Sequence, residues 1–226
     1  MSSRGFAHKG LADDEVLRLR VKSEIRKRLR GLRKTTPAAA CAARSAKIVA
    51  NLEGLEIVHA ALSVALFWPI EDRHEVDLRP LDAFLRARGV AVHYPTVRDD
   101  GAMVFVRVAD PAEMQEHALG FQAPLQAGEE SSGPDVIVVP AIAIDPLGHR
   151  IGYGAGYYDR ALRQLTGDGI GDAPVTVGVA FDFQLIPEVP AMPTDVPVEW
   201  VVTDQRVLRA SRAGIEDPAG GGPRRT

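Results

Sequence analysis

Helix-like and strand-like patterns of apolar residues alternate along this chain. The first helical pattern follows Asp13 and Asp14, which are placed to cap the helix, and its apolar residues recur at three- or four-residue spacing: Leu17, Val21, Ile25, Leu29 and Leu32. Further helices are predicted over residues 36–52, with Thr36 as N-cap and Pro37 at the first helical position, over 77–89 and from about 157. Strands are predicted over 60–68, 90–95, 103–108, 135–144, 175–181 and 199–203. This alternation favours an α/β fold with a largely parallel sheet covered by helices.

Size and composition bound the class of protein. The 226 residues, 46% of them apolar, suffice for one domain with its own core. The formal net charge of −3 gives no general attraction to polyanions, so no nucleic-acid partner is expected. A single cysteine, Cys41, excludes an internal disulfide and a multi-thiolate zinc site. No apolar run reaches the roughly 18 residues of a membrane span, and the first residues lack a signal-peptide pattern, so we expect a cytoplasmic protein without a membrane partner.

A glycine-rich stretch, GHRIGYGAGYYDRAL (residues 148–162), comes between a predicted buried strand and a predicted helix. Its alternating glycines remove the side chains that would hold a phosphate away, and the N-terminus of the following helix attracts anions. Arg150 adds a positive charge, Tyr157 and Tyr158 offer flat faces to a heterocycle, and Asp159 is suited to Mg²⁺. The spacing matches neither the G-x-G-x-x-G dinucleotide fingerprint nor a P-loop. A tight structural turn with both tyrosines packed into the core is an equally good interpretation.

The same stretch resembles the signature of the 5-formyltetrahydrofolate cyclo-ligase (5,10-methenyltetrahydrofolate synthetase) family, P-x-x-x-[FV]-D-x-x-G-x-R-[LI]-G-x-G-x-G-[YF]-Y-D-R. The matching residues are Pro140, Asp145, Gly148, Arg150, Gly152, Gly154, Gly156, Tyr157, Tyr158, Asp159 and Arg160. Weaker similarity extends from about Val21 to Thr203. The resemblance implies a three-layer α/β/α sandwich with a mostly parallel sheet, related to the ribose-5-phosphate isomerase/CoA transferase-like fold. We expect one cyclo-ligase domain over residues 13–211, between a flexible N-terminal tail (1–12) and a disordered C-terminal tail (212–226).

The resemblance also implies how ATP is bound. The family begins with the pattern K-x-x-[LI]-R, and KSEIR supplies Lys22 and Arg26, which share a helix face and are implied to grip phosphates. The implied ATP-binding residues are Lys22, Ser23, Glu24, Ile25, Arg26, Arg150, Ile151, Gly152, Tyr153, Gly154, Ala155, Gly156, Tyr157 and Tyr158. The alternative is a solvated basic face. Most of the other basic residues of this helix and its flank are interpreted as solvated: Arg18, Arg20, Lys27, Arg28, Arg30, Arg33 and Lys34.

For the folate, the resemblance implies contacts from Trp68, Glu75, Tyr153, Gly154, Ala155, Gly156 and Tyr157. Glu75 matches the glutamate that contacts folate in this family, whereas its neighbours alone favour an exposed, helix-capping carboxylate. Tyr157 and Arg150 are the implied catalytic residues. Asp159 and Asp195 are implied to hold Mg²⁺, and the six histidines are too scattered to suggest a transition-metal site.

The reaction implied is ATP-dependent conversion of 5-formyltetrahydrofolate, with or without a polyglutamate tail, to 5,10-methenyltetrahydrofolate, with ADP and phosphate as co-products. This reaction passes through a phosphorylated formyl intermediate and needs no protein nucleophile. The protein is expected to be a monomer. The chain departs from the family pattern at Gln122, Ala123, Ala155, Met192 and Thr194. Two alternatives stay open: a non-catalytic homologue that binds folate or nucleotide, and a sugar-phosphate isomerase or CoA transferase-like enzyme of the same fold.

Overall fold

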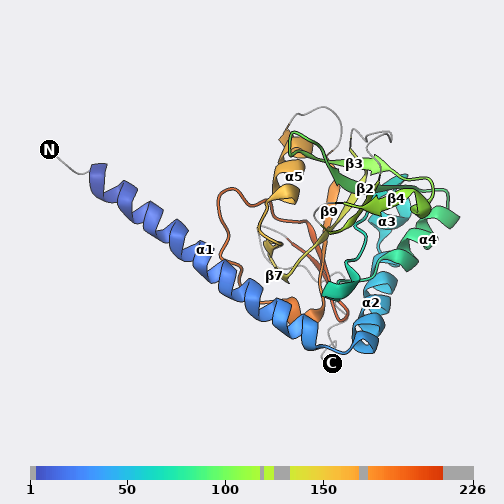
Figure 1. The fold of residues 1–226 in the computed structure, drawn as a ribbon, viewed down its shortest axis with the longest axis horizontal. Coiled ribbons are helices and arrows are strands. Elements are labelled where there is room, and N and C mark those ends of the chain that lie inside the picture. The colour runs from blue at the N-terminus through green and yellow to red at the C-terminus, as the bar shows by residue number, and fades with distance from the viewer. Residues whose placement is uncertain (1–3, 118–119, 125–132, 168–172, 211–226) are drawn as a thin grey trace, which may run out of the picture.

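The computed structural model of this chain describes residues 4–117, 120–124, 133–167 and 173–210, and its centre is a seven-stranded sheet (Figure 1). The strands lie in the order β11-β10-β9-β6-β1-β2-β3. In chain order they are β1 (Ser63–Ala65), β2 (Ala91–Val97), β3 (Met103–Arg107), β6 (Val136–Pro140), β9 (Val175–Val179), β10 (Trp200–Val202) and β11 (Val207–Arg209). The inner strands β10, β9, β6, β1 and β2 are parallel, and β11 and β3 pair antiparallel at the edges. The prediction of a largely parallel sheet is confirmed.

Helices cover both faces of this sheet. Successive residues of a strand point to opposite faces, so Val64 and Val138 join one core cluster while Ala65 and Val139 join another. The first cluster also contains residues of α2 (Ala38–Glu53), α3 (Glu56–Ala60) and α4 (Arg79–Ala87), and the second contains residues of α5 (Tyr157–Gly167). The layers agree with the predicted sandwich. The more distant fold relationship stays a prediction.

Helix α1 (Arg4–Thr35) begins earlier than the sequence pattern predicts. Residues 4–12, expected to be a flexible tail, are helical. Asp13 and Asp14 therefore lie inside the helix, and the prediction that they cap it is wrong. The pattern misleads here because the amphipathic signal starts only at Leu17, whereas a helix can continue past its apolar stripe wherever solvent accepts its side chains.

The apolar stripe predicted for α1 is buried only in part. Leu17, Val21 and Leu32 are 58%, 40% and 46% exposed. Leu17 lies in the N-terminal half of α1, which extends away from the rest of the molecule (Figure 1). Within residues 13–35, the part of the helix whose burial is described, the buried residues are Lys22, Leu29 and Arg33. Two of these three residues are basic, so this face of α1 meets a polar environment as well as a small apolar cluster.

The second helix starts one residue later than predicted. Pro37 is its N-cap, and the Thr36 hydroxyl instead donates to the Leu32 carbonyl oxygen of α1 at 2.9 Å. The prediction that Thr36 caps α2 is thus wrong, because its side chain is used to end the preceding helix. The end of α2 at Glu53, followed by Gly54, agrees with the pattern.

The strand predicted over 135–144 is divided in two. After β6, the chain forms a short hairpin of β7 (Ala143–Ile144) and β8 (Arg150–Ile151). In its turn, an oxygen of the buried Asp145 carboxylate accepts hydrogen bonds at 3.0 Å from the amides of Leu147 and His149. Gly148 has φ +83°, and a Cβ there would lie 2.0 Å from the Val198 carbonyl oxygen. The hairpin directs the chain straight into the glycine-rich loop.

The remaining described elements are small: the hairpin of β4 (Met114–Glu116) and β5 (Gln122–Pro124), and the 3-10 turns η1 (Glu71–Arg73), η2 (Pro111–Glu113) and η3 (Asp182–Gln184). The tail predicted over residues 212–226 lies outside the described residues. In the described part of the chain, no helix has the length and apolarity needed to cross a membrane.

Candidate active site

A cavity of about 750 Å³ opens where the central strands end. Phe67 and Trp68, just after β1, and Pro140, the last residue of β6, line it, together with α1, the glycine-rich loop and the first turn of α5. The predicted site residues found in its walls are Lys22, Arg26, Trp68, Glu75, Arg150, Ile151, Gly152, Tyr153, Gly154, Ala155, Gly156, Tyr157, Tyr158, Asp159 and Asp195. Ligands of open parallel sheets bind at this carboxyl edge.

Three residues predicted for ATP binding do not line this cavity. Ser23 and Glu24 are exposed on α1, and Ile25 packs against the small apolar cluster around Leu29. Only residues on one stripe of a helix can face the same side, and Lys22 and Arg26, four positions apart, share that stripe.

The glycine-rich loop presents bare backbone to the cavity. Gly154 and Gly156 have φ values of +107° and +68°, in the region that favours glycine, and no atom lies within 4 Å of the place that a Cβ of Gly152 would take. Arg26 Nε donates to the Gly152 carbonyl oxygen at 2.8 Å and ties the loop to α1. The loop has the open backbone that close approach of a phosphate requires.

Arg150 and Asp159 form an ion pair at the base of this loop. Arg150 Nη2 donates to Asp159 Oδ1 at 2.9 Å, and Nη1 donates to the Val196 carbonyl oxygen. Burial lowers the pKa of Arg150, and the Asp159 carboxylate acts in the opposite direction. Asp159 Oδ1 also accepts the Val196 amide at 3.1 Å. The pair therefore joins β8, α5 and the segment before β10.

Lys22 and Asp195 form a second ion pair between α1 and that same segment. The Lys22 ammonium donates to Asp195 Oδ2, which also accepts the Met192 amide at 2.8 Å. One turn earlier in α1, Arg18 donates to the Ala191 carbonyl oxygen at 2.7 Å. The stretch 191–195 thus runs beside α1, as Figure 1 shows for the orange loop next to the blue helix.

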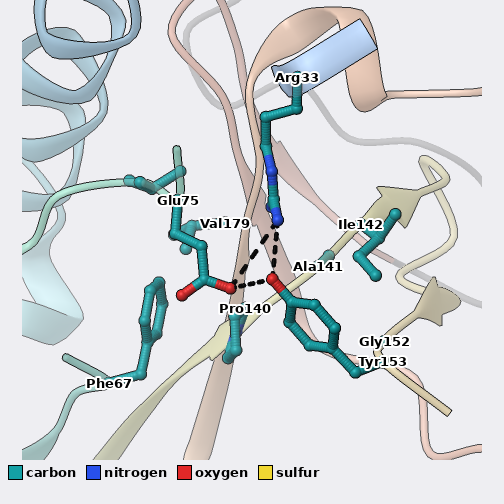
Figure 2. A pocket seen from close by; sticks show the side chains of 10 residues that line it. Arg33, Phe67, Glu75, Pro140, Ala141, Ile142, Gly152, Tyr153 and Val179 are labelled. Atoms are coloured by element: carbon teal, nitrogen blue, oxygen red, sulfur yellow. Dashed lines mark hydrogen bonds and ion pairs between the residues drawn. The ribbon is translucent and has the colours of Figure 1, made fainter. Parts of the chain in front are cut away.

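A third polar group joins Arg33, Glu75 and Tyr153 (Figure 2). Arg33 Nη2 donates to the Tyr153 hydroxyl at 2.7 Å and lies 3.9 Å from Glu75 Oε1, and the Tyr153 hydroxyl donates to that oxygen. Glu75 Oε2 accepts the Ile70 amide at 2.9 Å. Glu75 is buried, so its interpretation as an exposed helix cap is wrong. Arg33 is also buried and is thus an exception among the basic residues of α1, most of which were interpreted as solvated.

The two adjacent tyrosines serve both the cavity and the core. Both line the cavity and pack against the core cluster on the α5 face, where the Tyr158 ring lies 6.4 Å from that of Phe105. The Arg160 guanidinium lies 5.0 Å from the Tyr157 ring centroid. The Tyr158 hydroxyl is buried without a hydrogen-bond partner among the described residues, and burial raises the pKa of this phenol. The glycine-rich stretch therefore lines a cavity, as the first interpretation predicts, and its two tyrosines also pack into the core, as the second predicts.

Several cationic residues near the site were missed by the sequence analysis. Arg73, Arg160 and Arg163 line the cavity, and Arg33 lies directly behind Glu75. A signal for Arg33 exists in the sequence: positions 22, 26, 29 and 33 follow one helical stripe, and three of the four are basic.

This geometry can be compared with known proteins. A model of the 5-formyltetrahydrofolate cyclo-ligase family matches residues 18–204. The chain belongs to this family. Members of the cyclo-ligase family are ligases that use ATP as co-substrate.

Individual relatives agree with this membership. The chain is 30% identical over 200 residues to a 5-formyltetrahydrofolate cyclo-ligase of Mycolicibacterium smegmatis, covering 85% of this chain and 98% of that one. It is 30% identical over 152 residues to the Escherichia coli (strain K12) cyclo-ligase, covering 65% and 80% of the two chains. The solved structure of Aquifex aeolicus 5,10-methenyltetrahydrofolate synthetase superposes with a TM-score of 0.73 at 31% identity, covering 89% of this chain and 100% of that one.

The departures from the cyclo-ligase pattern lie in or beside the cavity wall. Met192, Thr194, Gln122 and Ala155 all line it. Met192 and Thr194 stand where the family pattern has a glutamate and a histidine, and both belong to the turn in which the Asp195 amide donates to the Met192 carbonyl oxygen. The changes therefore alter the surroundings of the ligand while the ion pairs of Lys22 and Asp195 and of Arg150 and Asp159 are kept.

Asp159 and Asp195 are compatible with a Mg²⁺ ion held partly by a ligand. Among the described residues, no group of three or more His, Cys, Asp or Glu side chains could hold a metal ion. Each of these two residues nevertheless lines the cavity, and its carboxylate accepts hydrogen bonds from the described residues through one oxygen, Oδ1 of Asp159 and Oδ2 of Asp195. Mg²⁺ typically binds one or two carboxylates together with water and substrate phosphates. The residues therefore fit this metal.

Proposed function

We propose that this chain converts 5-formyltetrahydrofolate to 5,10-methenyltetrahydrofolate while ATP is cleaved to ADP and phosphate. The observation that carries the proposal is the meeting, in one cavity of a cyclo-ligase family member, of a bare glycine loop, the cations Lys22 and Arg26, and the buried carboxylate of Glu75. The first two suit a polyphosphate, and the third suits the N–H donors of a pterin.

The proposed chemistry activates an amide oxygen, which is a poor leaving group. The formyl oxygen attacks the γ-phosphorus of ATP, and the bond to ADP breaks. N10 of the folate then attacks the formyl carbon and loses its proton, and the C–O bond breaks to release phosphate. Catalysis of such a transfer is mainly positioning and charge stabilisation, so no protein nucleophile takes part.

On the nucleotide side, Lys22 and Arg26 reach the cavity from a rigid helix and would exchange their present partners, Asp195 and the Gly152 carbonyl oxygen, for phosphate oxygens. Arg150 is bonded to Asp159 and Val196, so we assign to it the positioning of Asp159. Asp159 and Asp195 are the residues proposed to hold Mg²⁺. When bound, this ion neutralises phosphate charge.

On the folate side, Glu75 would accept pterin N–H donors, and Trp68 and Tyr157 would pack against the ligand. Cations at the cavity wall, Arg73 and Arg163, suit a polyglutamate tail. We further propose that the protein is a monomer, with residues 13–211 as its single domain and the cytoplasm as its place of action.

The proposal is tested by following the absorbance of methenyltetrahydrofolate when purified protein, Mg-ATP and 5-formyltetrahydrofolate are mixed. Product is expected only with ATP, and Asp159→Ala should abolish it. Glu56→Ala is the matched control, because Glu56 is an exposed carboxylate on α3 that does not line the cavity. Binding of both ligands without product would instead identify a binding homologue, and product formation without ATP would overturn the proposed reaction.

A further inference from the structure

Tyr153 is held from several sides although it lies in the glycine-rich loop. Its ring lies under two guanidinium groups, with Arg73 at 4.8 Å and Arg30 at 5.7 Å from the ring centroid. Its hydroxyl lies between Arg33 and Glu75 (Figure 2). Tyr153 therefore fastens the loop both to α1 and to the segment around Glu75. Its neighbours in the chain are Gly152, which is half-buried, and Gly154, which is exposed.

These contacts use the carboxylate that the proposed function assigns to the pterin. Glu75 Oε2 accepts the Ile70 amide, and Oε1 accepts the Tyr153 hydroxyl, while the side chain is only 6% exposed. Burial raises the pKa of the Tyr153 phenol, and the nearby Glu75 charge acts in the same direction, so the phenol keeps its proton and donates it. A ligand N–H group that binds Oε1 must therefore compete with this hydroxyl.

The surroundings decide which way Tyr153 can move. Behind the three side chains lies a space of only about 10 Å³, enclosed by Phe67, Ala141 and other residues in Figure 2, which is room for about one water molecule. A phenol ring cannot enter it, so the ring can move only toward the large cavity or the solvent, to which Tyr153 is 36% exposed. Arg33 stays 3.9 Å from Glu75 Oε1 and remains as a counter-charge when the phenol leaves.

We propose that Tyr153 is a displaceable latch, whose hydroxyl occupies Glu75 in the free protein and is replaced there by the N–H donors of the bound folate. Arg33 is the positioning residue that holds Glu75 as a charged acceptor during this exchange. The identity of the ligand rests on the proposed function. The latch lowers the apparent affinity for folate, because part of the binding free energy is spent on breaking the contact between Tyr153 and Glu75.

The decisive variant is Tyr153→Phe, which keeps the ring and its contacts with Arg73 and Arg30 and removes only the hydroxyl, with its hydrogen bonds to Glu75 and Arg33. We expect 5-formyltetrahydrofolate, titrated calorimetrically without ATP, to bind about 5-fold more tightly than to the unmodified protein, the size of one ordinary hydrogen bond. Tyr94→Phe is the matched control, because it removes a buried hydroxyl, bonded to Asp82, that does not line the cavity; its Kd should be unchanged. Weaker binding by Tyr153→Phe would mean that the hydroxyl contacts the ligand directly and would overturn the latch, as would an unchanged Kd.

A second measurement asks whether the contact exists without any ligand. A double-mutant cycle of Tyr153→Phe and Glu75→Gln, followed by urea unfolding of the free protein, should show coupling between the two positions. Additive effects would overturn the latch. If the unmodified protein fails to bind 5-formyltetrahydrofolate while coupling is present, the assigned ligand is wrong and with it the proposed function, but the contact stands.

The role of Arg33 is tested separately. Arg33→Met should raise the Kd for 5-formyltetrahydrofolate at least about 10-fold while leaving the affinity for an ATP analogue unchanged, since Arg33 lies behind Glu75 and away from Lys22 and Arg26. Arg33→Lys keeps the charge and should recover part of the loss. Equal loss of both ligands, or no recovery by lysine, would indicate a merely structural residue.

Discussion

Lys22 of α1 forms a buried ion pair with Asp195, which lies 173 residues further along the chain. The two side chains are only 8% and 16% exposed. Lys22→Met leaves the Asp195 carboxylate without its counter-charge, so we expect the free energy of unfolding in urea to fall by about 3 kcal/mol. Lys27→Met, on the exposed side of the same helix, should change it by less than about 0.5 kcal/mol. Similar unfolding free energies for the two variants would contradict this account of the pair.

Two glycines of the signature should respond to alanine in opposite ways. Gly148→Ala places a Cβ 2.0 Å from the Val198 carbonyl oxygen at φ +83°, so it should lower the free energy of unfolding by at least about 3 kcal/mol. At Gly152 a Cβ meets no atom within 4 Å. Gly152→Ala should therefore fold normally but lose cyclo-ligase activity, because the methyl group stands where phosphate is proposed to approach. Thermal unfolding and the absorbance assay, run on both variants, distinguish these effects.

The stability of the protein should depend on pH through His93. This histidine of β2 is buried, and burial, with Arg107 nearby, lowers its pKa in the folded state. As the pH falls through about 6.5, His93 therefore becomes protonated in the unfolded chain before it does in the folded chain. The free energy of unfolding that is present above that pH decreases as the pH falls. Urea unfolding between pH 7.5 and about 5 should show this decline, and His93→Gln should reduce it. An identical decline in the variant would assign the effect to other groups.

The cyclo-ligase activity should require a divalent cation. Removal of metal with a chelator should stop product formation, and Mg²⁺ should restore it. Asp159→Asn and Asp195→Asn should each raise the Mg²⁺ concentration for half-maximal activity by at least about 10-fold. Activity that survives complete chelation would refute the metal site. Tryptophan fluorescence or circular dichroism of the variants serves to exclude unfolding as the cause.

The exposed half of α1 should tolerate changes that its packed half does not. Leu17 is 58% exposed, so Leu17→Ser should change the free energy of unfolding by less than about 0.5 kcal/mol. Leu29 is 6% exposed and packs in the cluster with Ile142 and Val189, so Leu29→Ala should cost about 2 to 4 kcal/mol. A large decrease in the free energy of unfolding for Leu17→Ser in dilute solution would contradict the exposed position of Leu17 and indicate that another part of the protein packs on it.

Patterns along the chain were sufficient for much of the fold and for part of the site. Buried strands such as β6 consist of consecutive apolar residues, and glycines at every second position are an unusual local pattern, so both features are visible in the sequence. The spacing of Lys22 and Arg26 is likewise fixed by helix geometry alone.

The remainder depends on tertiary contacts that no local pattern contains. Helix periodicity tells which residues share a face but not what that face meets, which is why Arg33 was grouped with basic residues interpreted mostly as solvated, although it is buried. The partnership of Tyr153 with Glu75 joins residues 78 positions apart. The N-cap of α2 was misassigned for a related reason, since the Thr36 hydroxyl can serve either the helix before it or the helix after it.

The distance along the chain between α1 and its partners also sets when the site can form during synthesis. The helix is translated before the rest of the domain, yet the carbonyl and carboxylate groups that Arg18, Arg26 and Lys22 bind belong to residues 191, 152 and 195. Domains fold as units once their chain is available, and contacts so far apart in sequence form late. Until almost the whole domain has been translated, the nascent chain therefore carries a cationic helix with no pocket to complete.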